Sequence, residues 1–203
     1  MVGGEEVKDY VILGLDIASY SQKPIEEQRD AQEAVDLMLQ QALDACRKPA
    51  AGEIHWLDAG DGGYALMRWS ERDALDVVQH LYERLRRHNK RASDEHQISF
   101  RTALHVGQIV HWRGNLGEKY AGHAINACAR LLGGMNRSHE DQVICSGEFY
   151  DKISSFEPVV NTLRLKDIKD KHGHLHRAYN LIREPGFGIH PLKEERHPDF
   201  MSR

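Results

Sequence analysis

The stretch that decides the fold is Glu53-Ile-His-Trp-Leu-Asp-Ala-Gly-Asp61-Gly-Gly-Tyr-Ala-Leu-Met-Arg-Trp69. Apolar and polar side chains alternate on both sides of a central Asp-Ala-Gly-Asp-Gly-Gly run, as they do in the two strands of a hairpin. Asp and Gly tolerate the left-handed backbone of tight turns. We therefore predict a hairpin that holds the carboxylate of Asp61 at its tip, close to bare backbone. An ordinary solvated Asp-Gly turn is the alternative interpretation of this stretch taken alone.

The segments around this hairpin predict an α+β sandwich, in which helices cover a largely antiparallel sheet. An apolar run from Tyr10 to Asp16 is typical of a central strand covered on both faces. Helical periodicity follows over residues 31–46 and returns over 74–85. Farther along we predict a hairpin of strands 98–106 and 108–112 that turns near Gly107, followed by a loop over 113–119. Two more helices are predicted over 121–135 and 146–153. Further strands are predicted over 143–145, 162–168 and 175–182.

Length and composition place the chain among small globular proteins. Its 203 residues predict one catalytic domain over residues 1–182 and a C-terminal tail over 183–203 rich in Pro, Gly, His and charge. The net charge of −4 argues against a nucleic-acid partner, and no apolar run reaches the length of a membrane span. The three cysteines are widely spaced and the N-terminus lacks a secretion signal, so we expect a cytoplasmic protein without a membrane partner.

Two acidic residues are candidates for metal ligands. Asp16 ends the first strand and Asp61 tips the hairpin, so the two carboxylates converge if these strands are neighbours. Together with the main-chain carbonyl of Ile17, they could hold two divalent ions, Mg²⁺ or Mn²⁺, on a triphosphate. Backbone amides of the turn that contains Ser19, Tyr20 and Ser21 could bind its phosphates.

A later helix offers a second set of polar groups. Asn126 and Arg130 are four residues apart, which places an amide and a guanidinium on one helix face. Such groups can hold a ribose and offset the charge of a phosphoryl transition state.

Four short motifs resemble the catalytic domain of class III nucleotidyl cyclases, in the order and at the separations of that family. They are Leu15-Asp-Ile-Ala-Ser-Tyr-Ser21, Gly60-Asp61, His105-Val-Gly107 and Gly122-His-Ala-Ile-Asn126-Ala-Cys-Ala-Arg130. Each motif is weak alone, but together they make the resemblance specific, and it covers roughly residues 7–182.

The resemblance implies a homodimer with composite active sites. Asp16, Ile17 and Asp61 of one protomer would hold two metal ions, and Asn126 and Arg130 would reach in from the other. The 3′-hydroxyl of a ribonucleoside triphosphate would attack the α-phosphate, giving a cyclic nucleotide and pyrophosphate. The family also uses a basic residue of the closing hairpin on phosphate; here Lys169 or Lys171 could fill that role.

The positions that read a purine in this family are replaced. Leu57 stands where adenylate cyclases carry Lys and guanylate cyclases usually carry Glu, and Lys119 stands where an acid or a small polar residue is usual. Trp56 could narrow the pocket or stack on a base, although a strand Trp is more often part of the core. Lys119 can donate to the carbonyl oxygens of uracil, so we expect UTP as substrate, with CTP as the next candidate.

This pattern is similar to the bacterial pyrimidine cyclases of Pycsar antiphage systems, whose cyclic UMP or cyclic CMP activates a separate effector. Two alternatives stay open: a bacterial adenylate cyclase with a divergent pocket, and a pseudo-cyclase that binds a nucleotide without turnover. An RNA-binding α+β module is disfavoured by the acidic balance. A diguanylate cyclase is excluded because the sequence has no Gly-Gly-Asp/Glu-Glu-Phe motif.

Overall fold

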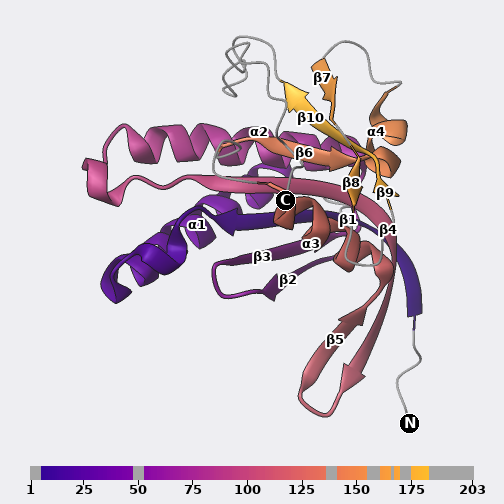
Figure 1. The fold of residues 1–203 in the computed structure, drawn as a ribbon. Helices are drawn as coiled ribbons and strands as arrows, with labels where there is room; N and C mark the ends of the chain where they lie inside the picture. Colours follow the sequence, from indigo (N-terminus) through magenta and orange to yellow (C-terminus); the bar gives the residue numbers. More distant parts are fainter. Residues whose placement is uncertain are drawn as a thin grey trace.

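A computed structural model of the chain describes residues 6–47, 53–135, 141–154, 161–165, 167–169 and 175–182 (Figure 1). Its helices are α1 (Ile25–Cys46), α2 (Glu71–Asn89), α3 (His123–Gly133) and α4 (Gly147–Ile153), with short 3-10 turns at Tyr20–Gln22 and Asp94–His96. Its strands are β1 (Glu6–Ile17), β2 (Ile54–Asp58), β3 (Gly62–Met67), β4 (Phe100–Gly114), β5 (Gly117–Ala121), β6 (Val143–Ser146), β7 (Asn161–Arg164), β8 (Ile168–Lys169), β9 (Leu175–His176) and β10 (Ala178–Ile182).

The main sheet has the strand order β2-β3-β1-β4-β6-β10-β7, with β5 paired to β4. Among the strand pairs of the described residues, β4–β6 is parallel and every other pair is antiparallel. The central strand β1 lies between β3 and β4, as its apolar run predicts. The prediction of an α+β fold with a largely antiparallel sheet is confirmed.

Helices cover both faces of this sheet (Figure 1). Side chains of β1 alternate, since successive residues of a strand point to opposite faces. Leu13 and Leu15 pack in the core with α1, α2 and α4, whereas Tyr10 and Ile12 pack in a second core beneath α3. Asp16 has the parity of Ile12, so its carboxylate belongs to the face that carries α3.

Helix α3 lies very close to β1, and Gly14 makes this approach possible. A Cβ atom at Gly14 would lie 2.8 Å from Cδ1 of Leu132 and 2.9 Å from Sγ of Cys128. Burial raises the pKa of the Cys128 thiol to about 12, so this sulfur acts as a small apolar group.

The prediction of a hairpin that turns near Gly107 is wrong. β4 runs through Gly107 as one continuous strand, and the hairpin is formed instead by β4 with β5, with Gly114 opposite Gly117. Gly107 serves a close contact rather than a turn, because a Cβ atom there would lie 2.9 Å from Cβ of Ala124 on α3. The predicted loop over residues 113–119 therefore contains most of β5, and the helix after it begins at His123.

The predicted tail, residues 183–203, lies outside the described residues. Among the helices of the described ranges, none combines the length and apolar character that crossing a membrane requires.

Candidate active site

The two predicted metal-binding acids lie together at one end of the sheet. Asp16 is paired with Gly62 in the β1–β3 register, and the amide of Ile17 donates a 2.7 Å hydrogen bond to the carbonyl of Asp61. Burial raises the pKa of Asp16, and the nearby carboxylate of Asp61 also raises it, while Arg101 acts in the opposite direction. A half-buried carboxylate beside another acid gains from a bound cation, because the cation offsets both costs.

Arg101 is a third charged group of this site, and the sequence reasoning missed it. It stands opposite Asp16 in the β1–β4 register and forms an ion pair with that carboxylate. Its Nη1 donates a 2.8 Å hydrogen bond to the carbonyl of Met135, just past α3. Its Nε is buried without a hydrogen-bond partner in the described structure. A lone arginine within the apolar strand before His105 was the signal that could have identified it.

The hairpin tip that carries Asp61 is held in place from two sides. The amide of Gly60 donates to the carboxylate of Asp58 over 2.6 Å, and the side-chain amide of Gln32 on α1 donates to the carbonyl of Gly60. Gly62 follows Asp61 with φ of +155°, and a Cβ atom there would lie 2.2 Å from the carbonyl oxygen of Leu15. A side chain at residue 62 would therefore displace the tip from β1.

The turn after β1 carries the residues predicted to bind phosphate. Ser19 adopts a left-handed conformation (φ 56°), and a 3-10 turn over Tyr20–Gln22 follows. Ser19 and Ser21 are exposed and Tyr20 is half-buried. Among the described residues, no acceptor is paired with the amides of Tyr20 and Ser21. Unpaired amides of this kind can bind phosphate oxygens.

Asn126 and Arg130 lie on α3, above the face that carries Asp16. The buried positions of this helix are Ala124, Cys128, Leu131 and Leu132. Asn126 is exposed and Arg130 is partly buried. The exposed position of Asn126 makes it accessible to a second molecule.

Of the residues predicted to read the base, only Leu57 lies on the face of Asp16. Leu57 is half-buried opposite Tyr64 and packs against the core beneath α3. Trp56 points to the other face of β2, where it lines a cavity of about 60 Å³ together with Asp36 of α1. Lys119 is exposed on β5, opposite Trp112. Within one protomer, the side chains of Trp56 and Lys119 therefore do not lie on the sheet face where the Leu57 side chain lies.

Neither lysine of the closing segment has a described side chain. Lys169 belongs to β8, and only its backbone is described, while Lys171 lies outside the described residues.

The donor set suits a hard divalent cation. The described residues contain no group of three or more His, Cys, Asp or Glu side chains that could enclose a metal. The carboxylates of Asp16 and Asp61 and the carbonyl of Ile17 form an incomplete set of oxygen donors. Mg²⁺ commonly binds through one or two carboxylates and completes its shell with water and substrate phosphates.

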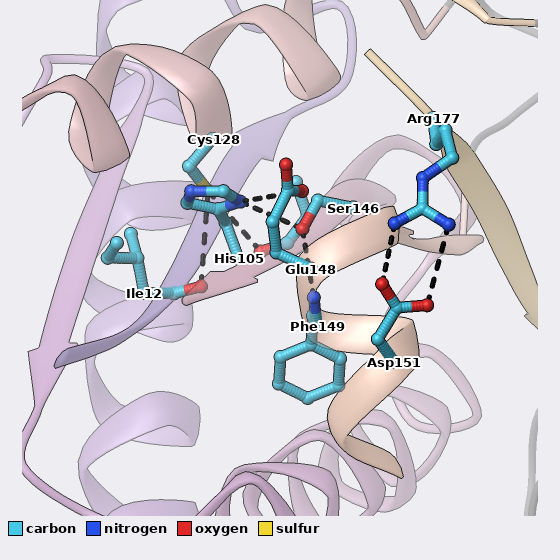
Figure 2. A network of polar contacts seen from close by, with 9 residues as sticks. Ile12, His105, Cys128, Ser146, Glu148, Phe149, Asp151 and Arg177 are labelled. Atoms are coloured by element: carbon cyan, nitrogen blue, oxygen red, sulfur yellow. Dashed lines mark hydrogen bonds and ion pairs between the residues drawn. The ribbon is translucent and has the colours of Figure 1, made fainter. Parts of the chain in front are cut away.

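The buried histidine His105 has a structural role (Figure 2). Its Nδ1 lies 2.8 Å from Oγ of Ser146 and 3.9 Å from the carboxylate of Glu148. Oγ of Ser146 also accepts a hydrogen bond from the amide of Phe149 and so caps α4. In a catalytic triad the two partners of the histidine lie at different ring nitrogens. Here one nitrogen faces both, so the network joins β4 to the β6–α4 junction.

The fold is that of solved adenylate and guanylate cyclase catalytic domains. The chain is similar to an adenylate/guanylate cyclase/hydrolase from Silicibacter pomeroyi, with TM-score 0.67 and 17% identity over 89% of this chain and 100% of the other. It is similar to the guanylate cyclase domain of RhGC from Catenaria anguillulae in complex with GTP, with TM-score 0.68 and 13% identity over 88% and 98%. A bacterial light-regulated adenylyl cyclase matches with TM-score 0.71 and 14% identity, over 88% of this chain and 53% of the other.

At these identities the similarities establish the fold. No protein-family model matches the sequence, and no curated protein matches it.

Proposed function

We propose that this protein is a nucleotidyl cyclase that converts a ribonucleoside triphosphate into a 3′,5′-cyclic nucleotide and pyrophosphate. The observation that carries the proposal is the proximity of the Asp16 and Asp61 carboxylates, beside Arg101, at the end of a sheet with the cyclase fold. Two adjacent carboxylates, which can hold metal ions, and one cationic side chain are the groups that metal-assisted phosphoryl transfer requires.

In the proposed reaction, the carboxylates of Asp16 and Asp61 and the carbonyl of Ile17 would hold two divalent ions. When bound, these ions neutralise the phosphate charge and lower the pKa of the attacking hydroxyl. The amides near Tyr20 bind phosphate oxygens, and Arg101 turns from the carboxylate of Asp16 to the triphosphate. The 3′-hydroxyl gives up its proton to solvent water, its oxygen forms a bond to the α-phosphorus, the bond from that phosphorus to the bridging oxygen breaks, and pyrophosphate leaves.

The proposal includes a two-fold homodimer. Asn126 is exposed on α3, and Arg130 follows it by about one turn on the same helix. An antiparallel partner would bring both residues to the opposing carboxylates, where the guanidinium offsets charge on the transition state. Each dimer would then contain two equivalent composite sites.

We infer UTP as substrate and cyclic UMP as product, with the cyclic nucleotide acting on a separate antiphage effector as in Pycsar systems. Support comes from Leu57, which lies on the face of Asp16 and offers no hydrogen bond to a purine edge. Adenylate cyclase activity is the first alternative, and nucleotide binding without turnover is the second.

The deciding experiment is incubation of the purified protein with equal concentrations of ATP, GTP, CTP and UTP in Mn²⁺ or Mg²⁺. Mass spectrometry identifies the cyclic products, and Asp61→Asn serves as the inactive control. Cyclic UMP as the main product is the expected result. Cyclic AMP as the main product would overturn the pyrimidine assignment alone. No cyclic product from any triphosphate, with nucleotide bound, would overturn the cyclase assignment.

A further inference from the structure

We propose that Tyr64 contacts the nucleoside part of the substrate, with its phenol hydroxyl donating a hydrogen bond to an acceptor oxygen. The inference rests on the proposed function, because it assumes that the triphosphate binds at Asp16 and Asp61. It adds a substrate-contacting residue that belongs to none of the four sequence motifs.

The position of Tyr64 follows from the strand register. Asp16 is paired with Gly62, and two residues along the same strands Gly14 is paired with Tyr64. Two residues of a strand correspond to about 7 Å. Leu57 stands on the other side of Tyr64, on β2. Tyr64 therefore lies between the proposed metal-binding acids and the apolar position expected to face the base.

The sheet face around Tyr64 and Leu57 is partly exposed, whereas the neighbouring residue pair on the same face is buried. Ile12 and Leu66, one pair farther along, are fully buried, with exposures of 0%. Tyr64 and Leu57 are half-buried and pack only against the edge of that core. Gly14, beneath the Tyr64 ring, has no side chain, and a Cβ atom there would lie 3.3 Å from Cδ1 of Tyr64. The ring is thus supported from below while part of the residue faces out.

The hydroxyl of Tyr64 is available as a donor. Within the described part of the chain, no hydrogen bond to this hydroxyl is found. Its oxygen is absent from the fully buried, unpartnered polar atoms, so it is accessible to a ligand. Burial raises the pKa of this phenol. The group therefore keeps its proton at neutral pH and donates to a neutral acceptor. Such an acceptor on a nucleoside is a ribose hydroxyl or a base carbonyl.

The test compares Tyr64→Phe with the wild-type protein and with Tyr150→Phe. The Tyr150 ring stacks on the Tyr179 ring, with 3.8 Å between their centroids. Tyr150→Phe therefore controls for the loss of a phenol hydroxyl away from the proposed site. Two readouts are used for each of the four triphosphates: binding, from the thermal shift that the nucleotide causes with Mg²⁺, and initial rates of cyclisation. The 2′-deoxy form of the preferred substrate is included as a fifth ligand.

Tyr64→Phe should weaken binding and raise KM by about three- to tenfold, with kcat little changed, since one neutral hydrogen bond contributes about 0.5–1.5 kcal/mol. If the loss of binding in Tyr64→Phe makes the affinities for the four triphosphates more alike, the contact is to the base. An equal loss for all four bases, absent for the 2′-deoxy ligand, assigns it to the 2′-hydroxyl. Tyr64→Leu, which also removes the ring, gives a second measurement and should weaken binding at least as much.

Binding and KM within twofold of wild type for every nucleotide in both Tyr64 variants would overturn the inference and leave the cyclase proposal standing. An equal loss in Tyr150→Phe would overturn it as well. If the wild-type protein binds triphosphates but forms no cyclic product, the cyclase proposal fails and binding alone decides the role of Tyr64. If it binds no triphosphate, both proposals fail.

Discussion

The amide of Ile17 donates a 2.7 Å hydrogen bond to the carbonyl of Asp61, which joins the end of the central strand to the tip of the β2–β3 hairpin. This bond occupies the amide of Ile17 and leaves its carbonyl for a cation. It also fixes the separation between the two acids through the backbone rather than through flexible side chains. A metal site that spans these residues would therefore be largely preformed.

Replacement of the first acid should separate metal binding from stability. A pKa raised in the folded state means that the ionised carboxylate of Asp16 opposes folding. Its contribution is most favourable below the ordinary value of 3.8 and is lost as the pH rises through the raised pKa. In EDTA at neutral pH, Asp16→Asn should therefore unfold at a temperature no lower than the wild-type protein.

Addition of Mn²⁺ should stabilise the wild-type protein and not Asp16→Asn. At a metal concentration of 100 times Kd, binding stabilises the folded state by about 2.7 kcal/mol. Thermal unfolding with and without Mn²⁺ measures this difference. Asp9→Asn is the matched control, since Asp9 is exposed on the same strand. An equal Mn²⁺ shift in Asp16→Asn would contradict the metal assignment.

The sequence predicts the α+β architecture and the meeting of Asp16 with Asp61, because both follow from strand periodicity and from a turn with strong local chemistry. It fails at Gly107, where a glycine in a strand has two explanations that only tertiary contacts separate. The missing side chain accommodates Ala124 of α3, and no turn forms. Arg101 was missed for the same reason, since its partner Asp16 is 85 residues away in sequence.

The composite-site proposal predicts complementation between two inactive proteins. Asp16→Ala lacks the carboxylate group and Arg130→Ala lacks the guanidinium, so each alone should be inactive. A mixed dimer has one intact site and one doubly broken site. After subunit exchange, random pairing places half of the dimers in the mixed form, so about a quarter of wild-type activity per protomer should return.

The measurement is the rate of cyclisation against mixing ratio, with exchange followed by differently labelled protomers. Mixing Asp16→Ala with Asp61→Ala is the control, because both changes affect the same half-site and no dimer is complete. Confirmed exchange without recovered activity would place the whole site within one protomer.

The buried His105 predicts a loss of stability in mild acid. Burial lowers the pKa of His105, against the opposing effect of Glu148 and with a smaller effect of His176 in the same direction as burial. The unfolded chain then takes up a proton near the ordinary value of 6.5 while the folded protein does not. Stability should therefore be full above that pH and fall as the pH drops below it.

His105→Gln keeps a polar contact for Ser146 but does not titrate. Its melting temperature should depend less on pH between about 7.5 and 5.5 than that of the wild-type protein, in which one histidine is linked to folding. Thermal unfolding over this range checks the difference, with His80→Gln as control because His80 lies on α2 with 38% of its side chain exposed. Parallel pH curves for wild type and His105→Gln would show that another group controls acid stability.

The pair formed by Arg101 and Asp16 predicts opposite effects on metal and nucleotide. Without substrate the guanidinium neutralises the carboxylate that a metal ion would use, so it competes with the metal. With a metal bound, Asp16 would no longer need the guanidinium, which would be available to the triphosphate. Arg101→Gln should therefore strengthen Mn²⁺ binding in the absence of nucleotide. It should weaken triphosphate binding and raise KM by at least about tenfold, since hydrogen bonds to charged groups contribute about 1.5–3 kcal/mol.

Calorimetric titration with Mn²⁺ alone, followed by titration with the triphosphate at saturating Mn²⁺, measures the two effects separately. Arg113→Gln is the matched control, because Arg113 lies on the same strand with 82% of its side chain exposed. Weaker binding of both ligands in Arg101→Gln would indicate that the arginine only supports the local structure, since loss of structure would impair the two steps alike. Stronger metal binding together with weaker nucleotide binding is the result expected if the Arg101 guanidinium moves from Asp16 to the phosphates when the triphosphate binds.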